Sequence, residues 1–205
     1  MPKTTSTSGQ ATRDRLLDAA HELMAVKGYT AASVDEICSA AGMTKGAFFH
    51  YFDSKEELAR ALAERVYASA KKTFTAAPCR TLSDPLERVF GYVDLLIEMS
   101  RDPAAAKGCI LGTFSQELAD THPGIRSVCA ACFKDWAADL EKDLRAAKAQ
   151  YAPKATWTAH GLAEHLIAVL EGAIILAKAK QDRKPIEDGL LHFKTYLRSL
   201  MERSV

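Results

Sequence analysis

The sequence of 205 residues predicts an all-α fold. Apolar residues recur at spacings of one, three and four positions, as is typical of one helix face. The first such group is Leu16, Leu17, Ala20, Leu23 and Met24. Ser-x-x-Glu capping boxes and prolines near helix starts punctuate the chain, and no segment alternates apolar and polar residues as a strand does. These observations together predict about nine helices.

Start and stop signals place each helix in turn. The first helix ends at Lys27-Gly28, where a basic last turn precedes a glycine. Capping boxes beginning at Ser33 and Ser54 start the second and fourth helices, and Thr44 caps the short third helix. The expected helices cover residues 10–27, 34–41, 45–51, 55–74, 85–100, 104–120, 124–150, 156–180 and 186–202.

The first three helices predict the domain organisation. The second and third are short and are joined by a tight turn that contains Gly42, which is helix-turn-helix geometry. We therefore expect a polar, disordered arm over residues 1–9, a helix-turn-helix DNA-binding domain over 10–55, and a regulatory and dimerisation domain over 56–205.

Composition excludes several classes of protein. Lys and Arg number 27 against 26 Asp and Glu, so the net charge of +1 argues against a binder that relies on bulk positive charge. No apolar run is long enough to span a membrane, and the N-terminus lacks the apolar core of a signal peptide, so we expect a cytoplasmic protein. Five cysteines, an odd number, argue against a disulfide framework.

Two stretches of the helix-turn-helix segment carry a family resemblance. They are SVDEI at Ser33–Ile37 and AAGMTKGAFFHYFDSKEEL at Ala40–Leu58. Together they resemble the DNA-binding domain of the tetracycline-repressor (TetR) family. The resemblance implies a homodimeric repressor on a palindromic double-stranded DNA operator. It also implies a small-molecule effector that binds the C-terminal domain and weakens operator binding.

Candidate DNA contacts cluster around the third helix. Gly46 lets the backbone approach DNA closely, and a helix N-terminus offers N–H groups to phosphate. Phe49 stands where the family often has Tyr, which favours an apolar contact such as one to a thymine methyl. His50 can equally be a solvated surface residue, whereas Phe48 and Phe52 are expected in the core. The candidates are Ser33, Thr44, Lys45, Gly46, Phe49, His50, Tyr51 and Lys55.

The last two helices carry apolar stripes that suit a four-helix bundle with a second copy. A dimer would place two recognition helices ~34–36 Å apart on successive major-groove faces. The alternative is that the stripes pack only within the chain. The candidate interface residues are Leu162, Leu166, Val169, Ala173, Leu190, Phe193 and Leu197.

Two kinds of effector site remain open. Aromatic residues of the middle helices, Phe90, Phe114, Phe133 and Trp136, suit a non-covalent apolar effector; alternatively they are ordinary core. Cys109, in a Gly-Cys pair, is similar to a subset of the family in which such a pair begins a central helix. In some of that subset the cysteine senses electrophiles or oxidants.

The environment expected for Cys109 supports thiol chemistry. A cysteine at a helix N-terminus has a stabilised thiolate, and the resemblance implies that Lys178 faces it from a buried position. Otherwise Cys109 is a small buried apolar residue. The pair Cys129 and Cys132 is a CxxC, which is expected in the core; a metal site and redox pairing are the alternatives. A thiol enzyme using Cys109 would need a Cys–His–acid arrangement, which nothing in the sequence indicates, so we expect no enzyme, metal or cofactor.

Overall fold

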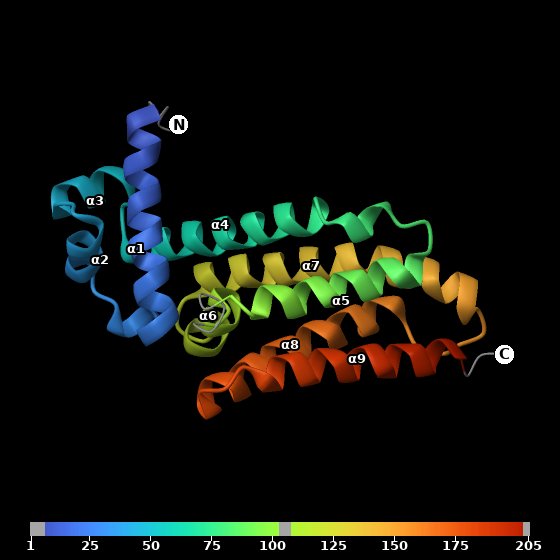
Figure 1. Ribbon diagram of the computed structural model, residues 1–205. Helices are drawn as coiled ribbons and strands as arrows, with labels where there is room; N and C mark the ends of the chain where they lie inside the picture. Colours follow the sequence, from blue (N-terminus) through green and yellow to red (C-terminus); the bar gives the residue numbers. More distant parts are fainter. Residues whose placement is uncertain (1–6, 103–107, 203–205) are drawn as a thin grey trace. The chain divides into compact units, whose positions relative to one another are not determined.

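The computed structural model describes residues 7–102 and 108–202. These residues form nine α-helices and one 3₁₀ helix, with no strand among them, which confirms the all-α prediction (Figure 1). The elements are α1 (Thr7–Ala31), α2 (Val34–Ala41), α3 (Lys45–Tyr51), α4 (Lys55–Thr75), η1 (Pro78–Thr81), α5 (Pro85–Ser100), α6 (Ile110–Leu118), α7 (Pro123–Tyr151), α8 (Ala159–Lys180) and α9 (Lys184–Glu202).

The chain forms two compact units, and the functional boundary expected between residues 55 and 56 stays a prediction. Unit 1 comprises residues 1–67 and 110–130, and unit 2 comprises 68–109 and 131–205. α6 joins the N-terminal helices because it packs on α1. The arm expected over residues 1–9 lies outside the described residues for its first six positions, and α1 begins at Thr7.

Unit 1 encloses a core beneath the helix-turn-helix. Phe48 and Phe52, spaced by one helical turn, are almost fully buried together with Leu16 and Leu17 of α1. The guanidinium of Arg13 lies 5.0 Å from the centre of the Phe52 ring. The prediction that Phe48 and Phe52 are core residues is therefore confirmed.

The capping box before α2 is formed as predicted. The Ser33 hydroxyl accepts a hydrogen bond from the Glu36 amide, and the Glu36 carboxylate accepts one from the Ser33 amide. Lys27 also donates to Glu36, and these hydrogen bonds lower the pKa of Glu36 to about 2. α2 ends at Gly42, whose positive φ of 63° makes the tight turn into α3.

Several helix ends differ from the sequence expectation, and two of them lie at glycines. α8, for example, begins at Ala159 rather than residue 156, because Thr158 is its N-cap. α1 does not stop at Gly28: the backbone kinks there, with φ 81°, and one further turn runs to Ala31. α6 begins at Ile110 rather than residue 104, because Gly108 takes φ 102° and Cys109 is not helical. Residues 103–107, where the earlier start was expected, lie outside the described range.

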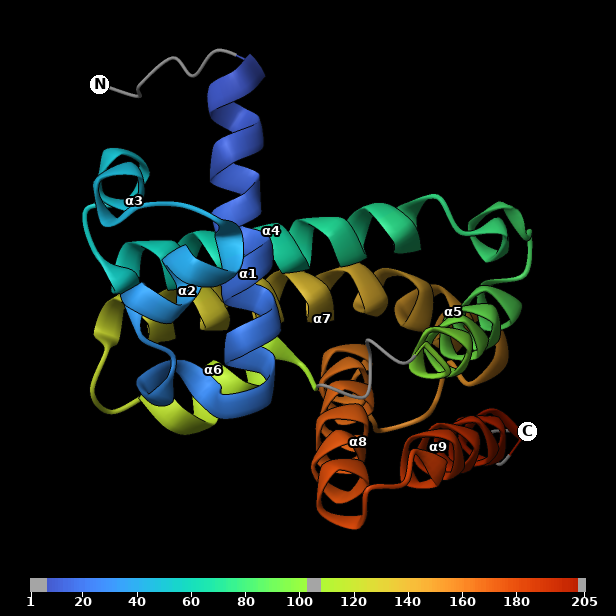
Figure 2. The ribbon, with the colours of Figure 1, turned by 60° about the vertical axis from the view of Figure 1, so that its left-hand side comes forward.

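Unit 2 has a separate core. α8 packs against α9, and α5 also packs against α9. A turn at the bottom of the view in Figure 2 joins α8 to α9. Their apolar stripes meet α5 and the later part of α7 in one continuous cluster. No described helix is long and apolar enough to cross a membrane.

Candidate functional site

α3 presents an exposed face above the buried Phe48. The Thr44 hydroxyl caps the helix by accepting a hydrogen bond from the Ala47 amide at 3.2 Å. Thr44, Lys45, Gly46, Phe49 and His50 are exposed, and Tyr51 is half-buried. Phe49 is 53% exposed, which is unusual for an apolar residue of that size. Six of the eight predicted DNA contacts therefore lie together on or beside this short helix.

Gly46 is not required by the packing of the chain. A Cβ at this position would lie 3.7 Å from the Thr44 hydroxyl oxygen, an ordinary contact, and no positive φ is present. A helical glycine of this kind lowers stability relative to alanine. What it supplies is a bare backbone on an exposed face, available to a partner outside the chain.

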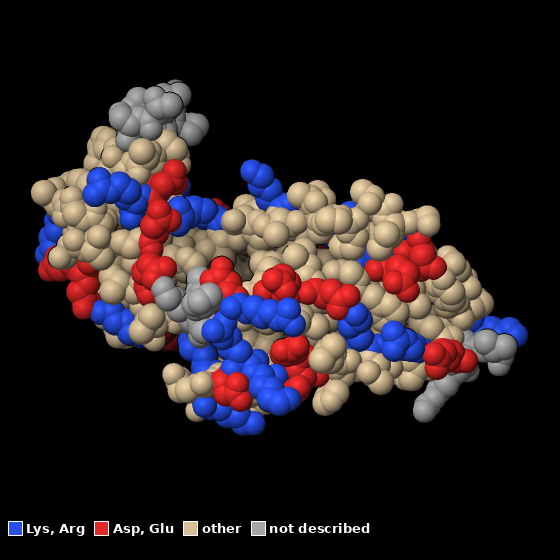
Figure 3. All heavy atoms as spheres, in the orientation of Figure 1, with Lys and Arg blue, Asp and Glu red and all other residues tan. Residues whose placement is uncertain are grey.

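Lys45 forms an exposed ion pair with Asp35 of α2, with Nζ 2.7 Å from the carboxylate. Such a pair contributes little to stability because water screens it. Its ammonium is therefore available to exchange the carboxylate for a phosphate oxygen. On the face seen in Figure 3, acidic and basic side chains are mixed over α1 to α3, so no single-sign surface marks this unit.

The other two predicted DNA contacts, Ser33 and Lys55, have partners inside the chain. The Ser33 hydroxyl belongs to the capping box of α2. Lys55 Nζ donates to the carbonyls of Tyr29 and Ala32, at 3.1 and 3.2 Å, and lies 4.2 Å from the Tyr29 ring centre. Burial lowers the pKa of Lys55. Both residues hold the connection between α1 and α2, and their contact with DNA stays a prediction.

Glu117 of α6 was not singled out from the sequence. Its carboxylate accepts hydrogen bonds from the backbone amides of Tyr29 and Thr30, at 2.8 and 2.7 Å. No local pattern could predict this contact, because 87 positions separate Glu117 from Thr30.

The five cysteines differ in exposure. Cys38, Cys79, Cys129 and Cys132 are buried, none of the five forms a disulfide, and Cys109 is half-buried. Burial raises the pKa of the Cys38 and Cys129 thiols, which makes them poor nucleophiles. Cys109 is thus the cysteine best placed to meet a reagent.

Cys109 lies beside two charged residues of α8. Its thiol donates a hydrogen bond to Glu171, whose pKa is raised by burial. The Glu171 Oε1 atom is buried without a hydrogen-bond partner among the described residues. Lys178 is exposed, not buried as the resemblance implied. Its Nζ lies 3.1 Å from where a Cβ of Gly108 would be, so Glu171 and Lys178 flank the Gly108–Cys109 segment.

The aromatic effector candidates divide between the units. Phe114 is buried in unit 1, where its ring meets Tyr29 edge-on. Phe90, Phe133 and Trp136 belong to unit 2: Phe90 is buried, and the half-buried Phe133 and Trp136 stack with ring centres 6.3 Å apart. The non-covalent effector site stays a prediction.

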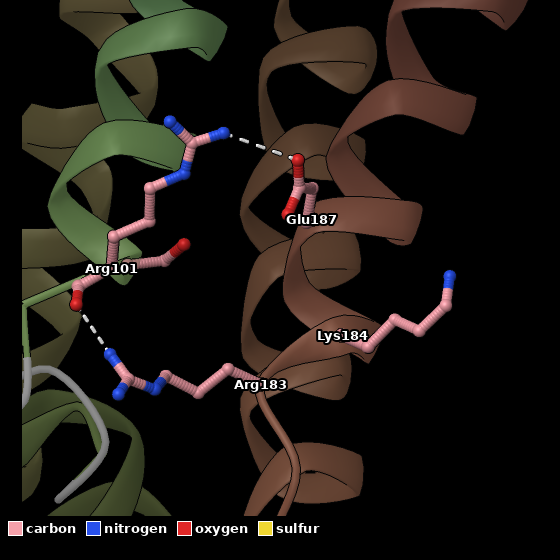
Figure 4. A pocket seen from close by; sticks show the side chains of 5 residues that line it. Arg101, Arg183, Lys184 and Glu187 are labelled. Atoms are coloured by element: carbon pink, nitrogen blue, oxygen red, sulfur yellow. Dashed lines mark hydrogen bonds and ion pairs between the residues drawn. The ribbon is translucent and has the colours of Figure 1, made fainter.

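One surface pocket of unit 2, about 380 Å³, has a polar lining of Ser100, Arg101, Arg183, Lys184 and Glu187. Arg183 donates to the Arg101 carbonyl, and Arg101 pairs with Glu187 (Figure 4). Lys and Arg side chains gather around the turn between α8 and α9 (Figure 3). This lining does not suit the apolar effector that the sequence suggested.

The candidate dimer residues lie inside the chain. All but Val169, which is half-buried, belong to the buried core of unit 2: Leu162, Leu166, Ala173, Leu190, Phe193 and Leu197. A side chain that is already buried within one copy of the chain adds no buried area when a second copy binds. The exposed apolar residues of α8 and α9 are instead Ile175 (46%), Leu176 (51%), Leu191 (44%) and Tyr196 (45%).

Two histidines of α8, which a thiol enzyme could in principle use, have partners of their own. His160 contacts the carboxylates of Glu141 and Glu164, and the His165 ring packs on Phe193 and Tyr196. Among the described residues, no three His, Cys, Asp or Glu side chains gather as a metal site would require.

The sequence matches two family descriptions: bacterial regulatory proteins of the tetR family over residues 16–62, and the tetracyclin repressor-like C-terminal domain over residues 85–193. It is 25% identical to the repressor DhaR of Mycobacterium sp. (strain GP1), covering 87% of this chain and 88% of that protein. It is 26% identical to the repressor NemR of Escherichia coli (strain K12), covering 91% and 94%.

Solved structures of TetR regulators share this fold. A TetR regulator from Chloroflexus aurantiacus J-10-FL has a TM-score of 0.83 at 26% identity, covering 94% of this chain and 97% of its own. The reduced form of E. coli NemR has a TM-score of 0.76 at 26% identity, covering 90% and 96%. With both family descriptions matched over most of its length, the chain belongs to the tetR family of bacterial regulatory proteins and is a regulator, not an enzyme.

Proposed function

We propose that this regulator is a homodimeric repressor that reads a palindromic operator with α3 and releases it when Cys109 is modified. The observation that carries DNA reading is the exposed α3 face, where Gly46 leaves the backbone bare without any need from packing. The relatives DhaR and NemR are named as transcriptional repressors, which supports repression over activation.

The outer faces of α8 and α9 support the dimer. Ile175 and Leu176 of α8 and Leu191 and Tyr196 of α9 leave exposed apolar side chains on two helices that pack against each other. An apolar surface of this kind is unfavourable in water and typical of an interface. A second copy would cover the same residues on both chains, because a two-fold contact uses one patch twice.

The setting of Cys109 supports thiol sensing. It is the least buried of the five cysteines by class, its thiol already donates to Glu171, and it directly precedes α6. With an activated alkene, sulfur forms a bond to the β-carbon while the π pair moves to the α-carbon and takes a proton. The thiol hydrogen thus adds across the double bond, and Glu171 is placed to accept and return it.

The alternative is a repressor with a non-covalent apolar ligand and no thiol chemistry. Phe133 and Trp136 favour it, because both are half-buried and stack in unit 2. The indole of Trp136 donates to the Tyr92 hydroxyl at 2.6 Å, so a ligand there would lie against an ordered aromatic group. Response to thiol reagents separates this alternative from sensing by Cys109.

Lys45→Ala tests DNA reading. We expect affinity for a duplex selected from a randomised library by the full-length wild-type chain (the selected duplex) to fall by about tenfold. The slope of affinity against salt should shrink by about one unit for each phosphate that the variant no longer binds. Fluorescence anisotropy at several salt concentrations measures both.

Asp35→Ala is the matched control for Lys45→Ala. It breaks the same ion pair but leaves the ammonium in place, so affinity should stay equal or rise. If both variants bind the selected duplex with the same affinity and the same salt dependence, Lys45 does not contact DNA.

Cys109→Ser tests the sensor. We expect N-ethylmaleimide to weaken binding of the wild type to the selected duplex by about tenfold, a coupling within the usual allosteric range. Cys109→Ser should bind the duplex as the wild type does and keep binding after treatment. Mass spectrometry of the treated proteins locates the adduct.

Cys79→Ser, which replaces a buried cysteine of the same unit, should respond like the wild type. If the treated Cys109→Ser protein still releases DNA, the sensing residue is not Cys109. A wild type that is modified at Cys109 and stays bound would favour the non-covalent alternative.

A further inference from the structure

A carboxylate of α6 holds the backbone of α1 where the helix kinks. At Gly28 the backbone turns, with φ 81° and ψ 174°, and the next two amides point to Glu117. Oε2 accepts from the Tyr29 amide at 2.8 Å, and Oε1 accepts from the Thr30 amide at 2.7 Å. One ionised group thus satisfies two N–H groups that begin a new helical turn, as an N-cap does.

Gly28 makes room for this carboxylate. A Cβ at that position would lie 2.6 Å from Oε2 of Glu117, closer than real contacts allow, and a positive φ already disfavours a side chain. The kink and the contact therefore depend on each other. Burial raises the pKa of Glu117, but hydrogen bonds from Thr30 and Tyr29 outweigh that effect and hold the pKa below its ordinary value, so the group is ionised near neutral pH.

The same connection is held from its carbonyl side. Lys55, the first residue of α4, donates to the carbonyls of Tyr29 and Ala32. The buried Tyr29 ring also packs edge-on against Phe114, which lies on α6 with Glu117. The four residues from 29 to 32 are thus fixed by hydrogen bonds on both backbone groups and by an aromatic contact.

This connection leads directly into the DNA-reading helices. Ala32 is followed by Ser33, the N-cap of α2, and α2 packs on α3. A shift of the connection would change the starting direction of α2 and, with it, the exposed face of α3. All of these residues belong to unit 1.

We infer that Glu117 is a positioning residue for DNA recognition: its carboxylate, bound to the Tyr29 and Thr30 amides, sets the direction in which the helix-turn-helix leaves α1. The inference requires DNA binding by the family but not sensing by Cys109. It also predicts a change in specific DNA affinity that is opposite in direction to the change expected from charge alone. Removing an acidic group from a DNA-binding unit should strengthen attraction to phosphate, whereas loss of positioning should weaken specific binding.

Glu117→Gln tests the inference in the full-length protein. The carboxamide has one acceptor oxygen, so at least one of the two amides is left without its partner. We expect affinity for the selected duplex to fall by about tenfold, as about 1.4 kcal/mol would produce. Affinity for a random duplex should be unchanged or higher. Exchange of the Tyr29 or Thr30 amide hydrogen, followed by NMR, should become faster.

Asp120→Asn is the matched control, because it removes the same charge from an exposed position of the same unit. It should leave specific affinity and both exchange rates unchanged. Gly28→Ala, which places a methyl group against the carboxylate, should reproduce the loss of specificity if Glu117→Gln folds poorly.

Two results would overturn the inference. One is a Glu117→Gln protein that keeps wild-type specific affinity. The other is an equal fall for specific and random duplexes together with a lower melting temperature, because that pattern reports unfolding and not misplaced helices.

Discussion

Gly46→Leu is expected to remove DNA binding while leaving the protein at least as stable as before. The side chain would project from the exposed face of α3, and the space around the Gly46 Cβ position is open apart from Thr44. Replacing a helical glycine stabilises a helix by roughly 0.5–1 kcal/mol. The same side chain would hold the backbone of α3 away from the base pairs.

The expected size of this effect follows from the energy of base readout. A good base contact contributes about 1–3 kcal/mol, and a dimer would forfeit it in both half-sites. At about 1.4 kcal/mol for each factor of ten, affinity for the selected duplex should therefore fall by at least about thirtyfold, while the melting temperature stays equal or rises. Gly46→Ala should show a smaller decrease in the same direction. A Gly46→Leu protein that binds normally would show that α3 does not approach DNA closely.

Leu176→Glu is expected to convert the protein to a monomer and, through that, to weaken operator binding by about hundredfold or more. Leu176 is 51% exposed on α8, and a charge there would be buried against an apolar partner in the dimer. DNA binding falls because the second half-site then binds as a separate event, without the high effective concentration that a dimer supplies. Light scattering after gel filtration measures the mass.

Leu82→Glu is the matched control for this change. Leu82 follows η1 and is 44% exposed, so the same substitution is made at a comparably exposed leucine that belongs to neither α8 nor α9. The control should stay dimeric and bind DNA. A Leu176→Glu protein that also stays dimeric would place the interface elsewhere, and one that is monomeric but binds normally would contradict the need for two copies.

Local signals in the sequence predicted much of the fold. The capping box at Ser33, the Thr44 cap and the four-residue spacing of Phe48 and Phe52 each act within one helical turn, where sequence neighbours are spatial neighbours. Most of the predicted DNA face follows from them, because the alternation of buried and exposed residues on a short helix depends on nearby residues alone.

Contacts between distant segments could not be predicted in this way. The apolar stripe that contains Leu166 and Phe193 was recognised, but its spacing does not say whether its partner is the same chain or a second one; the structure places it in the core. The same limit hid the contact between Glu117 and Thr30, and the hydrogen bond from Cys109 to Glu171. In each case the residue type is compatible with more than one environment, so the sequence alone does not identify its partner.

The discontinuity of unit 1 has a consequence for how the protein is made. The helices that read DNA lie near the start of the chain, but α6 and the beginning of α7 belong to the same unit. Thr30 precedes Glu117 by 87 positions, so at bacterial or eukaryotic synthesis rates roughly 4–17 s pass before the carboxylate exists. During that interval the nascent helix-turn-helix lacks this contact with α6. The positioning role inferred for Glu117 therefore implies that an unfinished chain binds its operator more weakly than the complete one.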